Sequence, residues 1–266
     1  MISFAAARSA TKSSMVQAQL SEQTFLASLA AAELGQIGLA DKLRADYQGF
    51  YAAWKQSLAP GSFESRFWPR CDLVFEVEQD VASGDLARAR GTARAAREGL
   101  LEIDPGDDPA RRWQRANTLR RLHIARARVE IESGDFSAAD RELQWVAEAR
   151  RDLPVLKMES RRQHANEQAW SALVLARLGR ADEARPLAAQ ALAFQRELHA
   201  MATDDQMHKL DLAVALVASA WVDPGRAKGL LAEAQSAFDS LPADARALRT
   251  SRWIGSLIAD ARRGAR

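Results

Sequence analysis

Hydrophobic residues recur at intervals of three and four along most of the chain, which is the spacing of one face of an α-helix. Short segments that contain a glycine or a proline interrupt this pattern at nearly even intervals: IGLADKL, SGDLARA, SGDFSAA, LGRADEA and VDPGRAKGLL. The interrupting residues Gly38, Gly84, Gly134, Gly179 and Pro224 are 46, 50, 45 and 45 residues apart. Glycine suits a helix reversal because it adopts positive φ without steric cost. The pattern predicts about five helix–turn–helix units.

Residues next to the glycines support the same interpretation. Asp85 and Asp135 each follow a glycine, where a carboxylate can accept a hydrogen bond from the free N–H groups of the next helix. An alanine stands five positions after three of the glycines, at Ala89, Ala139 and Ala184. A side chain this small lets the second helix of a unit approach the first closely, so we expect all three alanines to be buried.

Turn-forming residues such as LAPGS (58–62) and DPGDDP (104–109) separate the units. We therefore predict an all-α fold, a right-handed solenoid of about five units with a C-terminal capping helix. The helix pairs are expected near 22–55, 65–102, 109–152, 156–200 and 204–240, with the cap at 243–263. Residues 1–20 are predicted to be an N-terminal segment, partly disordered or capping, and residues 21–266 a single helical-repeat domain.

Two units have small and aromatic residues at the spacing that is found in a known repeat family. GDFSAADREL has an aromatic residue two positions after Gly134, LGRADEARPLAAQAL has the same alanine spacing after Gly179, and the small residues Ala127 and Ala172 stand seven positions before these glycines. These positions resemble the tetratricopeptide repeat over about residues 65–240. The period near 45 exceeds the 34 residues of that repeat and is similar to the longer repeat arrays of bacterial signalling, kinase-associated and transcriptional regulatory proteins. The resemblance implies a concave groove that binds proteins or peptides.

Composition excludes several classes of protein. The 266 residues include 37 basic and 35 acidic ones, and a net charge of +2 is too small for a general nucleic-acid binder. The single cysteine, Cys71, excludes a disulfide framework and fits a reducing compartment. The chain has neither a secretory leader pattern nor an apolar window of about 18 residues. We expect a cytoplasmic protein without membrane association.

Motifs of the common catalytic folds are missing. The sequence contains no GxxxxGK[ST], GxGxxG, GxSxG, HExxH or CxxC. None of its four histidines has another at the i+3 or i+4 position that would favour metal binding on one helix face. The sequence therefore predicts no catalytic residues, no metal site and no cofactor.

The most distinctive charge cluster is the segment 110–128, ARRWQRANTLRRLHIARAR, with seven arginines on one predicted helix. Arg121 and Arg128 lie together between two apolar stripes, and the repeat alignment assigns them to the concave groove. Asn166 and Arg177 occupy the corresponding face of the next unit. We expect these four residues to form a strip that binds an anion or a carboxylate. A solvated basic face is the alternative interpretation.

Together these features favour a non-catalytic scaffold for protein or peptide partners, and a partner with an acidic segment would suit the arginines. The expected role is the regulatory or partner-binding module of a bacterial signalling system. An enzyme with a polar pocket, an RNA-binding solenoid and a peptide-pheromone sensor stay open as alternatives. The enzyme requires polar residues that converge on a closed cavity, whereas the scaffold requires an open groove.

Overall fold

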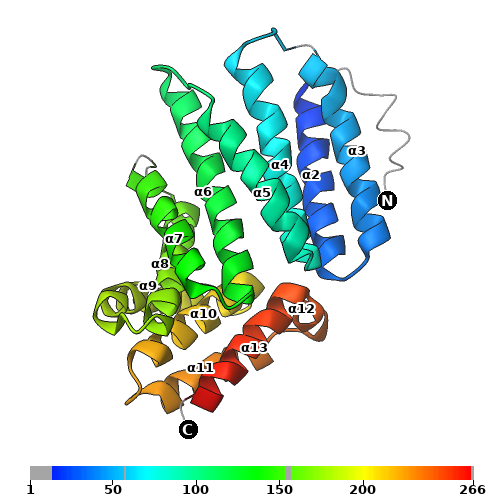
Figure 1. Ribbon diagram of the computed structural model, residues 1–266. Coiled ribbons are helices and arrows are strands. Elements are labelled where there is room, and N and C mark those ends of the chain that lie inside the picture. Colours follow the sequence, from blue (N-terminus) through cyan, green and yellow to red (C-terminus); the bar gives the residue numbers. More distant parts are fainter. Residues whose placement is uncertain (1–13, 57, 152, 154–156, 265–266) are drawn as a thin grey trace. The chain divides into compact units, whose positions relative to one another are not determined.

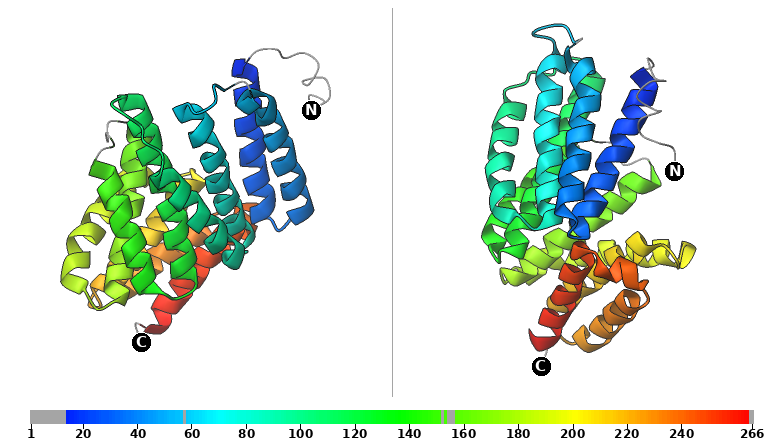
Figure 2. Two further views of the ribbon diagram at one scale, coloured as in Figure 1. Left: turned by 45° about the horizontal axis from the view of Figure 1, so that its top comes forward. Right: turned by 90° about the vertical axis from the view of Figure 1, so that its right-hand side faces the viewer.

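In a computed structural model that describes residues 14–56, 58–151, 153 and 157–264, every regular element is an α-helix (Figure 1). The all-α prediction is thus confirmed for these residues. The helices follow one another in adjacent pairs, as Figure 2 also shows. The pairs are α2 (Ser14–Glu33) with α3 (Ile37–Gln56), α4 (Phe63–Ser83) with α5 (Leu86–Leu101), α6 (Pro109–Glu132) with α7 (Phe136–Arg151), α8 (Met158–Arg177) with α9 (Ala181–Met201), and α10 (Gln206–Val222) with α11 (Ala227–Asp239).

Four of the five pairs reverse by the same hydrogen-bonded turn. Gly84, Gly134 and Gly179 have φ of 87°, 78° and 78°, as their place in the pattern predicts. The residue after each glycine donates its N–H to a carbonyl five residues earlier, for example Asp135 N to Glu130 O at 2.9 Å. This is the Schellman closure of a helix C-terminus. The carboxylates of Asp85 and Asp135 accept from the N–H groups of Arg88 and Ala138, so both predicted caps are confirmed.

The predicted glycine of the first reversal is wrong. Gly38 is the second residue of α3, and the positive φ of 73° belongs to Gly35. The turn depends on Gly35 because the N–H of Gln36 bonds to Ala31 O at 2.9 Å, which closes α2 three residues earlier than expected. The turn between α10 and α11 has no glycine of positive φ, and Asp223 ends α10 instead.

The structure divides into two compact units, one ending at Arg111 and one beginning at Arg112. In both, small residues let paired helices approach closely. Ala89, Ala139 and Ala184 are fully buried, as predicted. The second unit has the larger core, in which α10 is buried on nearly all sides from Lys209 to Ala220.

The chain ends in two helices rather than the single cap predicted over 243–263. α12 (Ala243–Ala247) stops at Leu248, whose extended backbone (φ −59°, ψ 140°) breaks the helix before α13 (Arg249–Gly264) begins. The buried residues of α13 are Ser251, Ile254, Ile258 and Ala261, a narrow stripe along one side of the helix.

At the other end of the chain, residues 1–13 of the predicted N-terminal segment lie outside the described residues, and 14–20 belong to α2. Across the described part of the chain, no helix combines the length and apolar character needed to cross a bilayer.

Candidate functional site

Arg128, one of the four predicted site residues, lies on the C-terminal half of α6. Its guanidinium donates to Glu132 Oε1 at 2.9 Å and to Thr250 Oγ1 at 2.7 Å, and its Cζ lies 5.1 Å from the ring centre of Trp253. Thr250 and Trp253 both belong to α13. The arginine therefore joins α6 to the last helix of the chain.

The other three predicted residues lie elsewhere on α6 and α8. Arg177 ends α8 with its guanidinium over two rings, 4.4 Å from Phe136 and 4.7 Å from Trp221. Asn166 is half-buried on α8, and its Oδ1 is enclosed without a hydrogen-bond partner. Arg121 is half-buried on α6. Arg128 and Arg177 thus contact different neighbours, and an aromatic ring is the shared feature of their surroundings.

Tryptophan stacking joins α13 to α8. The rings of Trp170 and Trp253 lie 5.1 Å apart at an angle of 13°. Next to this pair, Arg249 forms an ion pair with the buried Glu132 of α6. Offset stacking of two large rings and a hydrogen-bonded ion pair with a buried carboxylate are the kinds of contact that hold one helix firmly on another.

The middle and the C-terminal end of α13 contact α10 and α11. A Cβ atom at Gly255 would lie 3.0 Å from Phe238, and one at Gly264 would lie 3.0 Å from Trp221, so glycine at both positions permits close approach. Ile254 and Ile258 belong to the same core cluster as α10. The C-terminal halves of α6, α8 and α10, with Arg128, Glu132, Trp170 and Trp221, therefore form one surface that holds α13. We call it the helix-binding face.

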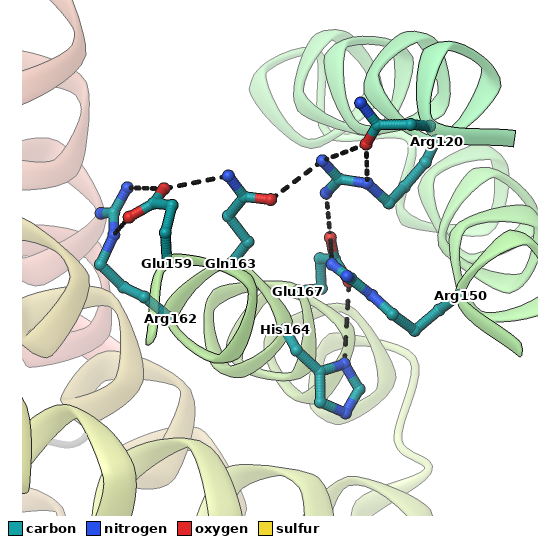
Figure 3. A network of polar contacts seen from close by, with 8 residues as sticks. Arg120, Arg150, Glu159, Arg162, Gln163, His164 and Glu167 are labelled. Atoms are coloured by element: carbon teal, nitrogen blue, oxygen red, sulfur yellow. Dashed lines mark hydrogen bonds and ion pairs between the residues drawn. The ribbon is translucent and has the colours of Figure 1, made fainter. Parts of the chain in front are cut away.

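The N-terminal half of α8 carries a second group of polar side chains, which Figure 3 shows. Its centre is the buried carboxylate of Glu167, which Arg150 of α7 contacts through Nε at 3.0 Å and Nη2 at 2.6 Å. Arg120 of α6 forms an ion pair with the same carboxylate. His164 Nδ1 lies 3.8 Å from Glu167 Oε2. Three helices therefore meet at one carboxylate, which we call the Glu167 cluster.

Charge compensation in this cluster determines the ionisation of Glu167. Burial alone would raise the pKa of the Glu167 carboxyl, but the nearby His164, the hydrogen bonds from Arg150 and the charge of Arg120 together hold its pKa below the ordinary value. Burial also lowers the pKa of the Arg120 guanidinium, against the attraction of Glu167. The carboxylate stays charged with both oxygens occupied, and the cluster acts as a structural junction.

A chain of hydrogen bonds continues from Arg120 to α10. Gln163 accepts from Arg120 at 3.1 Å and donates to Glu159 at 2.9 Å (Figure 3). Arg162 bonds to Glu159 through two nitrogens and donates to Asp211 Oδ2 of α10 at 2.6 Å. Burial raises the pKa of Asp211 to about 6, against the attraction of Arg162.

Among the described residues, no three His, Cys, Asp or Glu side chains are placed to hold a metal ion. The buried carboxylates of Glu132, Glu167 and Asp211 each form an ion pair with at least one arginine. The Glu167 cluster holds α6, α7 and α8 together, and Arg128, Glu132 and Trp170 contact α13.

Sequence reasoning missed Glu167, Arg150, Asp211 and the whole of α13 as a contact element. One pattern would have found part of this arrangement. Arg120 and Glu167 are 47 residues apart, and Arg162 and Asp211 are 49 apart, which is one repeat length. Opposite charges one repeat apart on successive first helices indicate an ion pair between neighbouring units.

Comparison of the chain with protein-family models, with curated proteins and with solved structures gave no match.

Proposed function

We propose that the protein is a non-catalytic interaction module of tetratricopeptide-like repeats, and that its helix-binding face holds an amphipathic helix of a partner protein. The observation that carries this proposal is the position of α13. A helix of 16 residues already lies on α6, α8 and α10, and it is anchored there by Trp253 on Trp170. A face that holds one helix has the apolar width and the polar anchors for another of the same chemistry.

The contacts of α13 define that chemistry. A tryptophan meets Trp170, a hydroxyl meets Arg128, and an arginine meets the buried Glu132. Isoleucines one turn apart, at 254 and 258, fill the space beside α10. The partner we propose is a helix with an aromatic anchor, a β-branched apolar stripe and a cation near its first turn. The helix bound on this face supplies a cation to Glu132. A wholly acidic partner segment would lack this cation, although the arginines of α6 on their own favour an acidic partner.

Tethering gives α13 an advantage over any partner. A helix joined to its binding surface by a short linker has an effective concentration in the millimolar range. A partner helix must therefore displace α13 or bind when α13 has left the face. Such competition suits a regulatory module of a signalling system, which is the role that the family resemblance implies.

The proposal is tested by adding the helix in trans. A fluorescein-labelled peptide of residues 243–264 is titrated into the unaltered 266-residue chain and into its variants, and the anisotropy of the peptide is measured. The variant Arg249→Ala/Trp253→Ala weakens the hold on the tethered α13, and we expect it to bind the peptide at least tenfold more tightly than the unaltered chain. Adding Trp170→Ala to this variant should abolish the gain.

Two controls keep the result interpretable. Arg185→Ala changes a side chain that is 67% exposed and should leave peptide affinity unaltered. Circular dichroism and thermal melting must show that each variant remains helical and cooperative. Equal peptide affinity in the unaltered chain and the weakened variant, or full binding without Trp170, would contradict the proposal.

A further inference from the structure

A polar pocket lies in the other unit, the one that ends at Arg111. Its volume is about 280 Å³. Six side chains from α3, α4 and α5 line it: Arg44, Gln48, Glu76, Asp80, Arg88 and Thr92. The lining contains two guanidinium groups and two carboxylates, so the pocket is neutral overall but strongly charged within.

The two arginines differ in how closely they contact the buried carboxylate of Asp80. Arg88 Nη2 donates to Asp80 Oδ1 at 2.6 Å, and this carboxylate is only 1% exposed. Arg44 Nη1 lies 3.8 Å from the same oxygen, beyond hydrogen-bond distance, while its Nη2 donates to Asp41 at 3.1 Å. Asp80 therefore has a close partner in Arg88, and Arg44 is the guanidinium with donor capacity toward the pocket.

Glu76 is the corresponding acceptor. It accepts a hydrogen bond from Gln48 Nε2 at 3.2 Å. An ionised carboxylate has about four lone-pair sites, so this single contact leaves room for an ammonium group. The pocket thus presents an unsaturated cation and an unsaturated anion on its walls, together with the hydroxyl of Thr92.

The volume of the pocket indicates how large a ligand it can hold. A cavity of about 150 Å³ holds a benzene ring, which has six heavy atoms. On this scale a pocket of about 280 Å³ holds about ten heavy atoms. A second, much smaller cavity shares Arg44, Gln48 and Glu76 with this pocket and is lined by the aromatic residues Phe25, Tyr47 and Phe75. Its volume of about 10 Å³ suits at most a single water.

We propose that this pocket binds a small zwitterion, a free α-amino acid with a polar side chain. Its carboxylate pairs with Arg44, its ammonium group pairs with Glu76, and its side chain meets Gln48 and Thr92. A simple anion would meet Glu76 and Asp80, and a simple cation would meet Arg44 and Arg88, so each would incur repulsion from half of the lining. A zwitterion satisfies both halves. This site is independent of the helix-binding face.

Calorimetric titration of the 266-residue chain tests the proposal. The probes are L-serine, L-asparagine, L-glutamine and L-arginine, and we expect at least one to bind with a Kd below about 1 mM. The N-acetyl derivative of that amino acid lacks the ammonium charge and its amide lacks the carboxylate, and each should bind at least tenfold more weakly. Absence of binding for all four amino acids, or equal binding of either derivative, would overturn the proposal.

Variants locate the site. Arg44→Gln and Glu76→Gln each remove one charge and should weaken the amino acid at least tenfold. Glu98→Gln changes an exposed carboxylate of α5 outside the pocket and should leave binding unaltered. Binding that survives both pocket substitutions would overturn the assignment, provided that melting curves show all variants folded. Trp170→Ala, which tests the helix-binding face, should bind the amino acid normally.

Discussion

Two groups of arginines and carboxylates in this protein use the same chemistry with opposite results. In the Glu167 cluster, two arginines occupy both oxygens of one buried carboxylate. In the pocket of the other unit, Arg44 forms only a long ion pair with Asp80, at 3.8 Å, and lines a volume of about 280 Å³. The first group is saturated by its own members, whereas the second leaves donors and acceptors facing open space.

The difference indicates how to distinguish a structural ion pair from a binding site. A buried charge must be compensated, because removal of one partner leaves the other desolvated and unpaired. Where all members of a cluster compensate one another, their role is to hold helices together. Where compensation is incomplete beside a cavity, a ligand can complete it. Charge-removing substitutions should therefore harm stability in the first group and ligand binding in the second.

The largest effect is expected for Glu167→Gln. This substitution leaves Arg120 and Arg150 buried without a charged partner, and loss of one member of a buried pair costs about 3–5 kcal/mol. Urea unfolding followed by circular dichroism measures the change. A loss below about 1 kcal/mol would show that water, not the protein, compensates these arginines.

A matched variant separates charge from packing in the same cluster. Replacing Arg120, Arg150 and Glu167 together by Met, Met and Leu removes every charge while keeping the volume similar, and such replacements are often neutral. We expect the triple variant to be more stable than Glu167→Gln alone. If the triple variant is less stable, the three charged side chains stabilise the fold by more than the cancellation of one another's charge.

A smaller, pH-dependent effect is expected for Asp211→Asn. Burial raises the pKa of Asp211 in the folded chain to about 6, above its value in the unfolded chain. The stability of the unaltered protein should therefore decline, relative to the variant, as pH rises from about 4 to about 6, by up to about 3 kcal/mol. Urea unfolding of both proteins between pH 4 and pH 7 measures this difference, and a difference that is independent of pH would contradict it.

The smallest effect on stability is expected for Glu76→Gln. The side chain is half-exposed and bonds to Gln48, which a glutamine at position 76 can also do, so the free energy of unfolding should change by less than about 1 kcal/mol. The same chemical change, Glu to Gln, that is expected to destabilise the Glu167 cluster should here affect amino-acid binding alone. A stability loss as large as that of Glu167→Gln would remove the distinction between the two groups.

Much of the fold could be predicted from the sequence because its cause is local. Positive φ at Gly84, Gly134 and Gly179 and the aspartate caps depend on residues within one turn. The first reversal could not be assigned in this way, because Gly35 and Gly38 stand three residues apart and both suit a turn. The hydrogen bond from Gln36 to Ala31, which decides between them, is visible only in the folded chain.

The site was less predictable because its contacts are distant in the chain. Arg128 and Thr250 are 122 residues apart, and no periodicity connects them. The pattern of α13 indicated an amphipathic helix but not the surface it covers. The ion pairs between residues one repeat apart are intermediate in predictability. Their residues are distant in the chain, but the repeat length relates Arg120 to Glu167 once the units are aligned.

Photo-crosslinking shows directly whether the helix-binding face accepts a helix. A peptide of residues 243–264 with benzoylphenylalanine in place of Trp253 is irradiated with the Arg249→Ala/Trp253→Ala chain, and mass spectrometry locates the attachment. We expect crosslinks on α8 around Trp170 and on the C-terminal half of α6. Crosslinks spread along the chain, or concentrated on α2 to α5, would contradict it.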